Sequence, residues 1–130
     1  MNQHRQEYIN YRLERSQQAF TDAKLLAGCE SWNAAINRLY YSCYYAVSAL
    51  ALQSNIVTQT HAGLKSQFNL HFVKTGKVPL EMGKLYSDLM DSRQKGDYGD
   101  MYDFDEETIN NLMQPVEDFL LAVKSLLVSV

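Results

Sequence analysis

The chain has 130 residues, of which 46% are hydrophobic and 21% charged, and a formal net charge of −3. These values are typical of one globular domain, and the acidic balance argues against binding of polyanions through bulk charge. Two isolated cysteines, Cys29 and Cys43, form no Cys-x-x-Cys pair and no His/Cys cluster, so we expect no zinc site. We also expect no other metal and no cofactor. No apolar run reaches the length of a membrane span and no secretory signal is found, so we expect a cytoplasmic location.

Helical periodicity runs through the chain, and no stretch alternates between apolar and polar residues as a strand would. The first helix is expected from about Gln3 to Ala27, and Gly28 suits the left-handed position after its end. The second helix is expected from Ser31, as N-cap, to about Gln53. Apolar residues cover most of its circumference, which is typical of a central helix or of one shared with a second subunit.

Two further helices are expected in the middle of the chain. The third begins after Thr60, as N-cap, and ends at Gly76, and Pro79 fits the first turn of the fourth. The apolar stripe of the fourth helix continues into Arg93, a charged residue that needs a partner if it is buried. Asp97 follows it at the i, i+4 spacing of a helical ion pair.

An acidic, glycine-containing segment, residues 97–107, separates the fourth helix from the last one. Within it, Asp103 and Glu106 resemble a capping box for the last helix. Pro115 lies inside that helix and predicts a kink or a later start. The chain is therefore predicted to be all-α, an up-and-down helical bundle of four to five helices in a single domain, residues 1–130.

The segment around Arg93 has two interpretations. Arg93 and Asp97 form an ion pair at a helix end in the first. In the second, Arg93 grips a phosphate at a cleft, with Tyr98 nearby as a hydrogen-bond donor. The spacing of these residues is compatible with both.

Arg38 lies among tyrosines of the second helix, and its guanidinium is expected to stack on Tyr41 or Tyr45, with Asn37 on the neighbouring face. The alternatives are a packed stem with its head in water, a protein interface, and an aromatic-lined site for a nucleotide or single-stranded nucleic acid. His61 has the unperturbed pKa of a general base, but the sequence gives it no orienting partner.

Three motifs in this order carry a family resemblance: Arg38 before Tyr40 and Tyr41, then Thr60, His61 and Gly63, then Arg93, Asp97 and Tyr98. Over about Ser16 to Leu127, the sequence resembles the HEPN domain (higher eukaryotes and prokaryotes nucleotide-binding). Within that family it resembles the small stand-alone bacterial and archaeal proteins. The resemblance implies an α-helical bundle, often a homodimer whose two fourth-helix regions face each other across a cleft.

The resemblance also implies a function. Many HEPN proteins are metal-independent endoribonucleases, and several are toxins neutralised by a minimal nucleotidyltransferase encoded alongside. Others are thought to bind nucleotides or to assist such a partner. We therefore expect a nucleotide- or RNA-binding or regulatory module, the partner of a minimal nucleotidyltransferase in a toxin–antitoxin-like pair, with its site at Arg93, Asp97 and Tyr98 and with Arg38 in support.

The alternative is a metal-independent endoribonuclease toxin with a variant active site. Ribonuclease members of the family carry an arginine followed, after four to six intervening residues, by a histidine. None of the arginines here has a histidine at that distance, and the places after Arg93 hold Tyr98, Gly99 and Asp100. In this alternative Arg93 clamps the scissile phosphate, and Tyr98 or His61 assists proton transfer.

Overall fold

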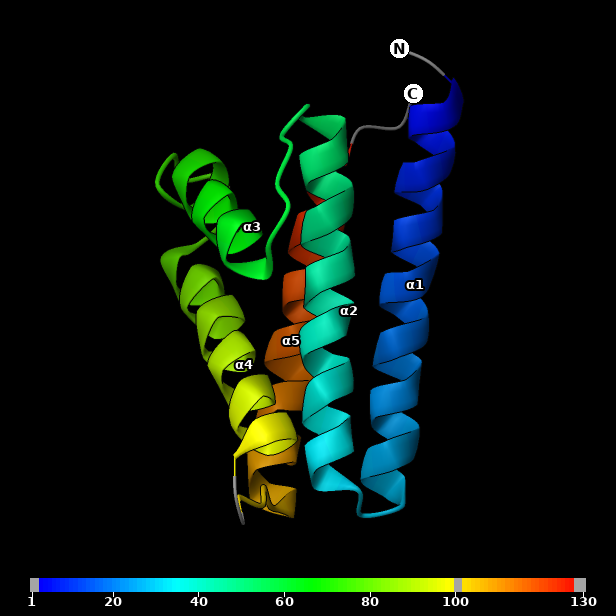
Figure 1. The fold of residues 1–130 in the computed structure, drawn as a ribbon, viewed down its shortest axis with the longest axis vertical. Coiled ribbons are helices and arrows are strands. Elements are labelled where there is room, and N and C mark those ends of the chain that lie inside the picture. The colour runs from blue at the N-terminus through cyan, green and yellow to red at the C-terminus, as the bar shows by residue number, and fades with distance from the viewer. Residues whose placement is uncertain (1–2, 100–101, 128–130) are drawn as a thin grey trace.

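The computed structural model describes residues 3–99 and 102–127, and within them it contains helices and no strand (Figure 1). The helices are α1 (Gln3–Gly28), α2 (Trp32–Gln53), α3 (His61–Phe68), α4 (Leu80–Tyr98) and α5 (Glu106–Leu126), and α3 continues directly into a π-helical turn, η1 (Asn69–Val73). The predicted all-α fold is confirmed. No helix in the described part of the chain is both long enough and apolar enough to span a bilayer.

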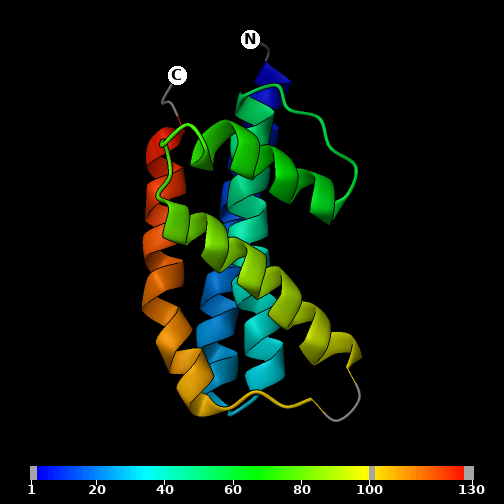
Figure 2. The same cartoon turned by 90° about the vertical axis from the view of Figure 1, so that its left-hand side faces the viewer.

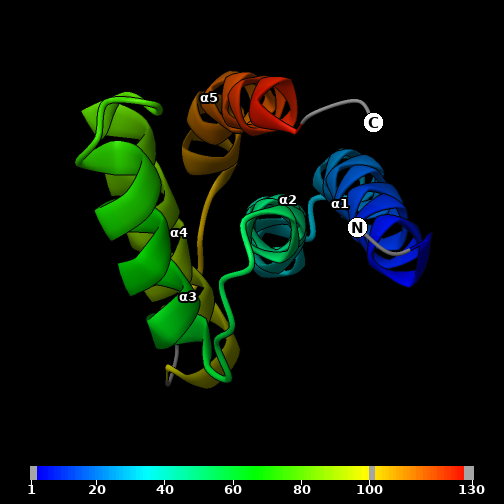
Figure 3. The same ribbon diagram turned by 90° about the horizontal axis from the view of Figure 1, so that it is seen from above.

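The second helix is the centre of the bundle. It packs against α1, α3, α4 and α5, and the view from above shows it enclosed by the other helices on several sides (Figure 3). Twelve of its 22 residues are buried. The apolar circumference of α2 is therefore explained by the chain's own helices. In the side view, α3 crosses the long axis of the bundle and links α2 to α4 (Figure 2).

Aromatic rings fill the space where α3, α4 and α5 meet α2. Tyr40 of α2 stacks on Tyr86 of α4, with ring centroids 6.0 Å apart and planes 8° apart. Phe68 of α3 meets the Tyr86 ring edge-on at 5.6 Å, and Phe119 of α5 lies 5.9 Å from it. All four rings are buried. The ring of Tyr40 thus belongs to the apolar core, while its hydroxyl is a polar group that can bond to a residue at the edge of that core.

The turn after α1 differs from the sequence prediction. Gly28 is the last helical residue, and Glu30 adopts the left-handed conformation instead, with φ 61°. The reason is a hydrogen bond of 2.9 Å from the Ser31 amide to the Leu26 carbonyl, which is the 6→1 bond of a Schellman motif and puts the left-handed residue just before Ser31. The assignment of Gly28 to this role was wrong.

The other boundaries agree more closely. Thr60 caps α3 as predicted, and its hydroxyl accepts from the Gly63 amide at 2.9 Å. The third helix ends earlier than predicted, in the π-helical turn, and Gly76 adopts a left-handed φ of 81° in the loop that follows. Pro79 lies one residue before α4, as its N-cap, and α5 continues through Pro115 without the later start.

The predicted capping box of α5 was also wrong. The N-cap is Asp105, and its carboxylate accepts from the amide and the hydroxyl of Thr108 at 2.9 and 2.7 Å. Asp103 lies outside the helix because Asn33 of α2 holds the amide of the next residue, Phe104, at 2.8 Å. This long-range bond keeps the segment before α5 non-helical.

We predict that Gly83→Ala lowers the free energy of unfolding by about 1–3 kcal/mol. Gly83 is buried where α4 meets η1, and a Cβ added there lies 2.9 Å from Cγ2 of Val73, a stiff β-branched side chain. Urea denaturation followed by circular dichroism measures the change. Gly28→Ala is the matched control, because its Cβ meets nothing within 4 Å and the substitution should stabilise by about 0.4–1 kcal/mol. Equal stability of the two variants would contradict the packing described for Gly83.

Candidate functional site

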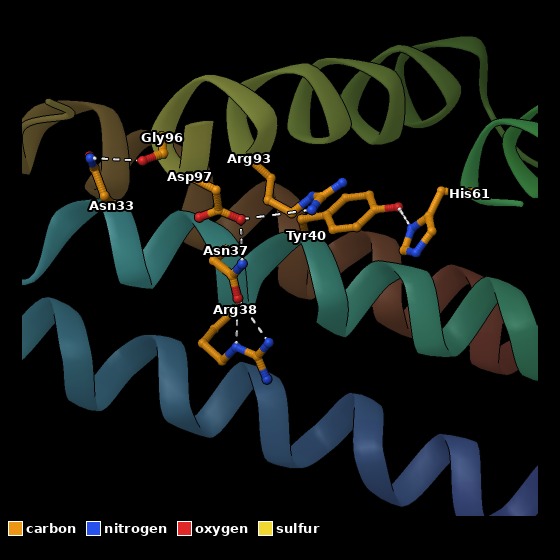
Figure 4. Close-up of polar contacts among 8 residues, drawn as sticks. All are labelled: Asn33, Asn37, Arg38, Tyr40, His61, Arg93, Gly96 and Asp97. Atoms are coloured by element: carbon orange, nitrogen blue, oxygen red, sulfur yellow. Dashed lines mark hydrogen bonds and ion pairs between the residues drawn. The ribbon is translucent and has the colours of Figure 1, made fainter. Parts of the chain in front are cut away.

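Polar side chains of α2, α3 and α4 meet beside the buried Tyr40 (Figure 4). Arg93 of α4 lies over this ring, with its Cζ 5.1 Å from the Tyr40 centroid and 5.7 Å from that of Tyr41. Its side chain is only 11% exposed, and Nη1 lies 3.7 Å from Oδ2 of Asp97. The predicted i, i+4 pair is therefore present, although it is longer than a charge-assisted hydrogen bond of about 2.8 Å.

Arg93 keeps hydrogen-bonding capacity in this position. Its Nε is buried and, among the described residues, has no hydrogen-bond partner. A guanidinium carries five N–H donors, and the long ion pair with Asp97 occupies at most a small part of them. The aromatic rings hold the cation in place while its remaining donors stay available for an anionic ligand.

The carboxylate of Asp97 pairs directly with Arg93 and is linked to Arg38 through the side chain of Asn37. It accepts a hydrogen bond of 2.9 Å from Nδ2 of Asn37, and Oδ1 of Asn37 accepts from Nε and Nη2 of Arg38 at 3.0 and 2.8 Å. The Arg38 guanidinium also lies over Tyr41, at 5.0 Å, which confirms the stacking predicted for Arg38. We call Arg38, Asn37, Tyr41, Arg93 and Asp97 the two-arginine site; it has two positive charges and one negative charge.

His61 is brought to this site from a distant part of the sequence. It is the first residue of α3, fixed by the Thr60 cap, and its Nδ1 lies 2.6 Å from the hydroxyl of Tyr40. The imidazole stacks on the ring of Tyr44 with centroids 4.4 Å apart. His61 and Arg93 therefore lie on two sides of Tyr40, one at its hydroxyl and one over its ring (Figure 4).

The surroundings keep both members of the Tyr40–His61 pair uncharged at neutral pH. Burial lowers the pKa of His61 below its ordinary value, and the positive charge of Arg93 lowers it further. Burial raises the pKa of Tyr40 to about 12, against an opposing effect of Arg93. When the neutral imidazole donates Nδ1–H to the phenol oxygen of Tyr40, its Nε2 can accept a proton, as a general base requires.

Two predicted residues lie away from this arrangement. Tyr98, the last residue of α4, is 73% exposed, and the described contacts include none between it and Arg93. Tyr45 lies 6.0 Å from Tyr41, but the cation over its ring is Arg15 of α1, at 5.7 Å. The structure brings together Arg93, Asp97, Asn37, Arg38, Tyr41 and His61, and leaves Tyr98 and Tyr45 at its margins.

Asn33 is a residue that the sequence analysis did not single out as functional. Its Nδ2 donates to the Tyr102 carbonyl at 2.8 Å and to the Gly96 carbonyl at 3.4 Å, and its Oδ1 accepts from the Phe104 amide. It thus ties the end of α4 and the segment before α5 to α2, beside Asp97. Asn33 lies on the same helical stripe as Asn37, four residues earlier, and that was the available signal.

Within residues 3–99 and 102–127, no group of three or more His, Cys, Asp or Glu side chains is placed to hold a metal ion. The chemistry of the cluster is that of guanidinium groups, a phenol, a carboxylate and an imidazole. Such groups bind anions, stack on aromatic bases and transfer protons.

These features define a helical-bundle protein with a cationic, tyrosine-lined site. The model of the HEPN domain family matches residues 9–126, and the chain belongs to this family. It is 39% identical over 123 residues to a UPF0332 protein of Thermotoga maritima, a match that covers 95% of this chain and 93% of the relative. It is 27% identical over 117 residues to a Methanocaldococcus jannaschii protein named "Putative toxin MJ0142", covering 90% and 80% of the two chains.

The fold is also similar to a solved structure, that of TT1696 from Thermus thermophilus. The TM-score is 0.78 at 14% sequence identity, and the match covers 92% of this chain and 98% of the other. At this level of identity the likeness supports the helical fold alone.

We predict that the imidazole of His61 titrates below its ordinary pKa of 6.5 and that Arg93→Ala raises the midpoint. Removing the guanidinium removes one of the two causes of the shift, while burial remains. Because the folded chain favours neutral His61, the associated stability is complete above the unfolded pKa and is lost as the pH falls below it. A histidine-selective NMR titration measures the midpoint, with Lys77→Ala as the charge-matched control. A midpoint that Arg93→Ala leaves unchanged would contradict the described proximity.

Proposed function

We propose that the chain is a HEPN module that binds a nucleotide or RNA at the two-arginine site. The observation that carries the proposal is the pair of guanidinium groups over one half-buried ring, with Arg38 and Arg93 5.0 and 5.7 Å from the Tyr41 centroid. One carboxylate, Asp97, offsets only one of the two charges. Arginine forks suit phosphate oxygens, and tyrosine faces accept stacked bases of any sequence.

The site concentrates positive charge on a chain whose net charge is −3. Binding therefore depends on these particular side chains and not on the field of the whole protein. The surplus positive charge lies beside partly desolvated rings, where an ionic hydrogen bond is stronger than in water. A phosphate would also satisfy donors of Arg93 that the chain itself leaves open.

The proposal includes a partner. The family assignment and the name "Putative toxin", carried by two Methanocaldococcus jannaschii relatives, support a role in a cytoplasmic toxin–antitoxin-like pair with a minimal nucleotidyltransferase, and a homodimeric state. Light scattering after gel filtration, alone and with the product of an adjacent nucleotidyltransferase gene, tests both points. A chain that elutes as a monomer and forms no complex with the nucleotidyltransferase would contradict this part of the proposal.

Arg93→Ala is expected to weaken binding of a mononucleotide and of a short RNA by roughly 10- to 100-fold, the range for loss of hydrogen bonds from a charged group. Fluorescence anisotropy at fixed salt measures both affinities. Lys77→Ala is the matched control, because it also removes a cation from an aromatic ring, that of Phe72, in the loop after η1. Unchanged affinity in Arg93→Ala, with wild-type folding by circular dichroism, would disprove binding at this site.

A metal-independent endoribonuclease is the second candidate, and the observation that favours it is His61 at the hydroxyl of Tyr40. With Nδ1–H donated to Tyr40, the lone pair of Nε2 is free to accept the proton of a ribose 2′-hydroxyl. The 2′-oxygen then attacks the adjacent phosphorus, the bond to the 5′-oxygen breaks, and the departing 5′-oxygen takes a proton from solvent water. Arg93 would stabilise the charge that develops on the phosphate oxygens.

For this candidate we expect cleavage of total RNA in the presence of EDTA by the wild-type chain, and a loss of about 10²- to 10⁴-fold in His61→Gln. Gel electrophoresis of the products, with a 2′,3′-cyclic phosphate at the new 3′ ends, is the measurement. Lys77→Ala should cleave like the wild type. RNA that stays intact with the wild-type chain rules out the enzyme while leaving the binding proposal intact.

A further inference from the structure

A polar pocket lies at the other end of the tyrosine-bearing face of α2. It is formed between α1, the C-terminal half of α2 and the segment 54–60 that leads to α3, and its volume is about 260 Å³. Figure 3 shows α1 and this segment on two sides of α2. Its polar lining consists of Arg12, Tyr44, Ser48, Thr58, Gln59 and Thr60. The volume is slightly below the range of about 300–1,000 Å³ for whole drug-sized ligands, so the pocket suits one functional group of a larger ligand.

Arg12 is the charged residue of this pocket. It is half-buried, and its Nη1 donates to the hydroxyl of Ser48, which is itself buried. Among the described residues, the ion pairs are His4–Glu7, Lys84–Asp88 and Arg93–Asp97, so no carboxylate neutralises Arg12. A half-buried guanidinium with most of its donors directed to no acidic group is suited to an anion.

Hydroxyl groups supply the other donors. Thr60 already accepts the Gly63 amide, so its hydroxyl hydrogen is free to donate, and Tyr44 and Thr58 bring two more hydroxyls to the lining. Hydroxyl and guanidinium donors without a facing carboxylate form the donor set that phosphate oxygens require. An apolar ligand would leave these donors unsatisfied.

The pocket is linked to the two-arginine site by a chain of three contacting rings. Tyr44 lines the pocket and stacks on His61, and His61 bonds to Tyr40, whose ring lies under Arg93. Along α2, Tyr41 at Arg93 and Ser48 at Arg12 are seven residues apart, or about 10 Å at 1.5 Å per residue. At about 3.4 Å per stacked nucleotide, that separation spans roughly three steps of a nucleic-acid strand.

We infer that the Arg12 pocket is a second phosphate-binding site, which holds a phosphate of the strand whose neighbouring nucleotides lie at the two-arginine site. The inference rests on the proposed function of that site. Between the two sites Arg15 lies over Tyr45 at 5.7 Å, so cations and aromatic rings alternate along the face. The ligand class is therefore a single-stranded oligonucleotide, which reaches both sites, in preference to a free nucleotide, which reaches one.

The test compares two ligands and three variants. Uridine monophosphate and a four-nucleotide oligouridylate are titrated into the wild-type chain, Arg12→Ala, Arg93→Ala and the control Lys77→Ala. We expect Arg12→Ala to weaken binding of the tetranucleotide by roughly tenfold or more and to leave the mononucleotide affinity unchanged. The slope of log K against log salt for the tetranucleotide should become less negative by about 0.7. Arg93→Ala should weaken both ligands.

The outcomes separate the two ideas. Wild-type affinity of Arg12→Ala for the tetranucleotide, with weakened binding by Arg93→Ala, overturns the second site and leaves the proposed function standing. Undiminished binding of both ligands by Arg93→Ala overturns the proposed function. If Arg12→Ala does not fold, Arg12→Gln keeps a side chain that can bond to Ser48 while removing the charge, and the same expectations apply to it.

Discussion

The buried ring of Tyr40 is the constraint on which the site depends. Tyr86 of the aromatic core stacks on the Tyr40 ring, and the guanidinium of Arg93 also lies over this ring. The hydroxyl of Tyr40 bonds to His61. Three helices thus meet at a single side chain that is fully buried. Because the ring of Tyr40 packs on Tyr86 while its hydroxyl bonds to His61, the packing of the core and the position of the imidazole are set together, and movement of α3 relative to α4 would disturb both.

Arg93 shows how the chain tolerates a charge in a nearly closed position. An arginine with 11% of its side chain exposed would usually be neutralised by a tight carboxylate bridge. Here the carboxylate of Asp97 is shared with Asn37 and stands 3.7 Å away, and the quadrupoles of two tyrosine rings supply much of the remaining stabilisation. The cation is thereby held in place without a close ion pair inside the protein, and this arrangement favours binding of an external anion.

The sequence predicted what local periodicity controls, and it failed where distant residues decide. The helices, the Thr60 cap and the i, i+4 spacing of Arg93 and Asp97 follow from short-range patterns. The start of α5 did not follow, because Asn33, more than sixty residues earlier, bonds to the segment before it. The meeting of His61 with Arg93 depends on α3 crossing the bundle axis, and that crossing angle is a property of packing between helices, which a linear pattern does not contain.

The bonds made by Asn33 involve only main-chain atoms of Gly96, Tyr102 and Phe104. The segment is therefore anchored by main-chain amide and carbonyl groups, which do not depend on the identity of the side chain. Gly96 is an exception for steric reasons, because an added Cβ would come within 3.1 Å of the Phe104 ring. The exposed Asp103 is consequently a position whose side chain can be replaced, whereas the ring of Tyr102 packs edge-on against Phe104. A single cysteine introduced in place of Asp103, with the exposed Cys29 replaced and the buried Cys43 left shielded, would carry a fluorophore close to Asp97 without altering the anchor.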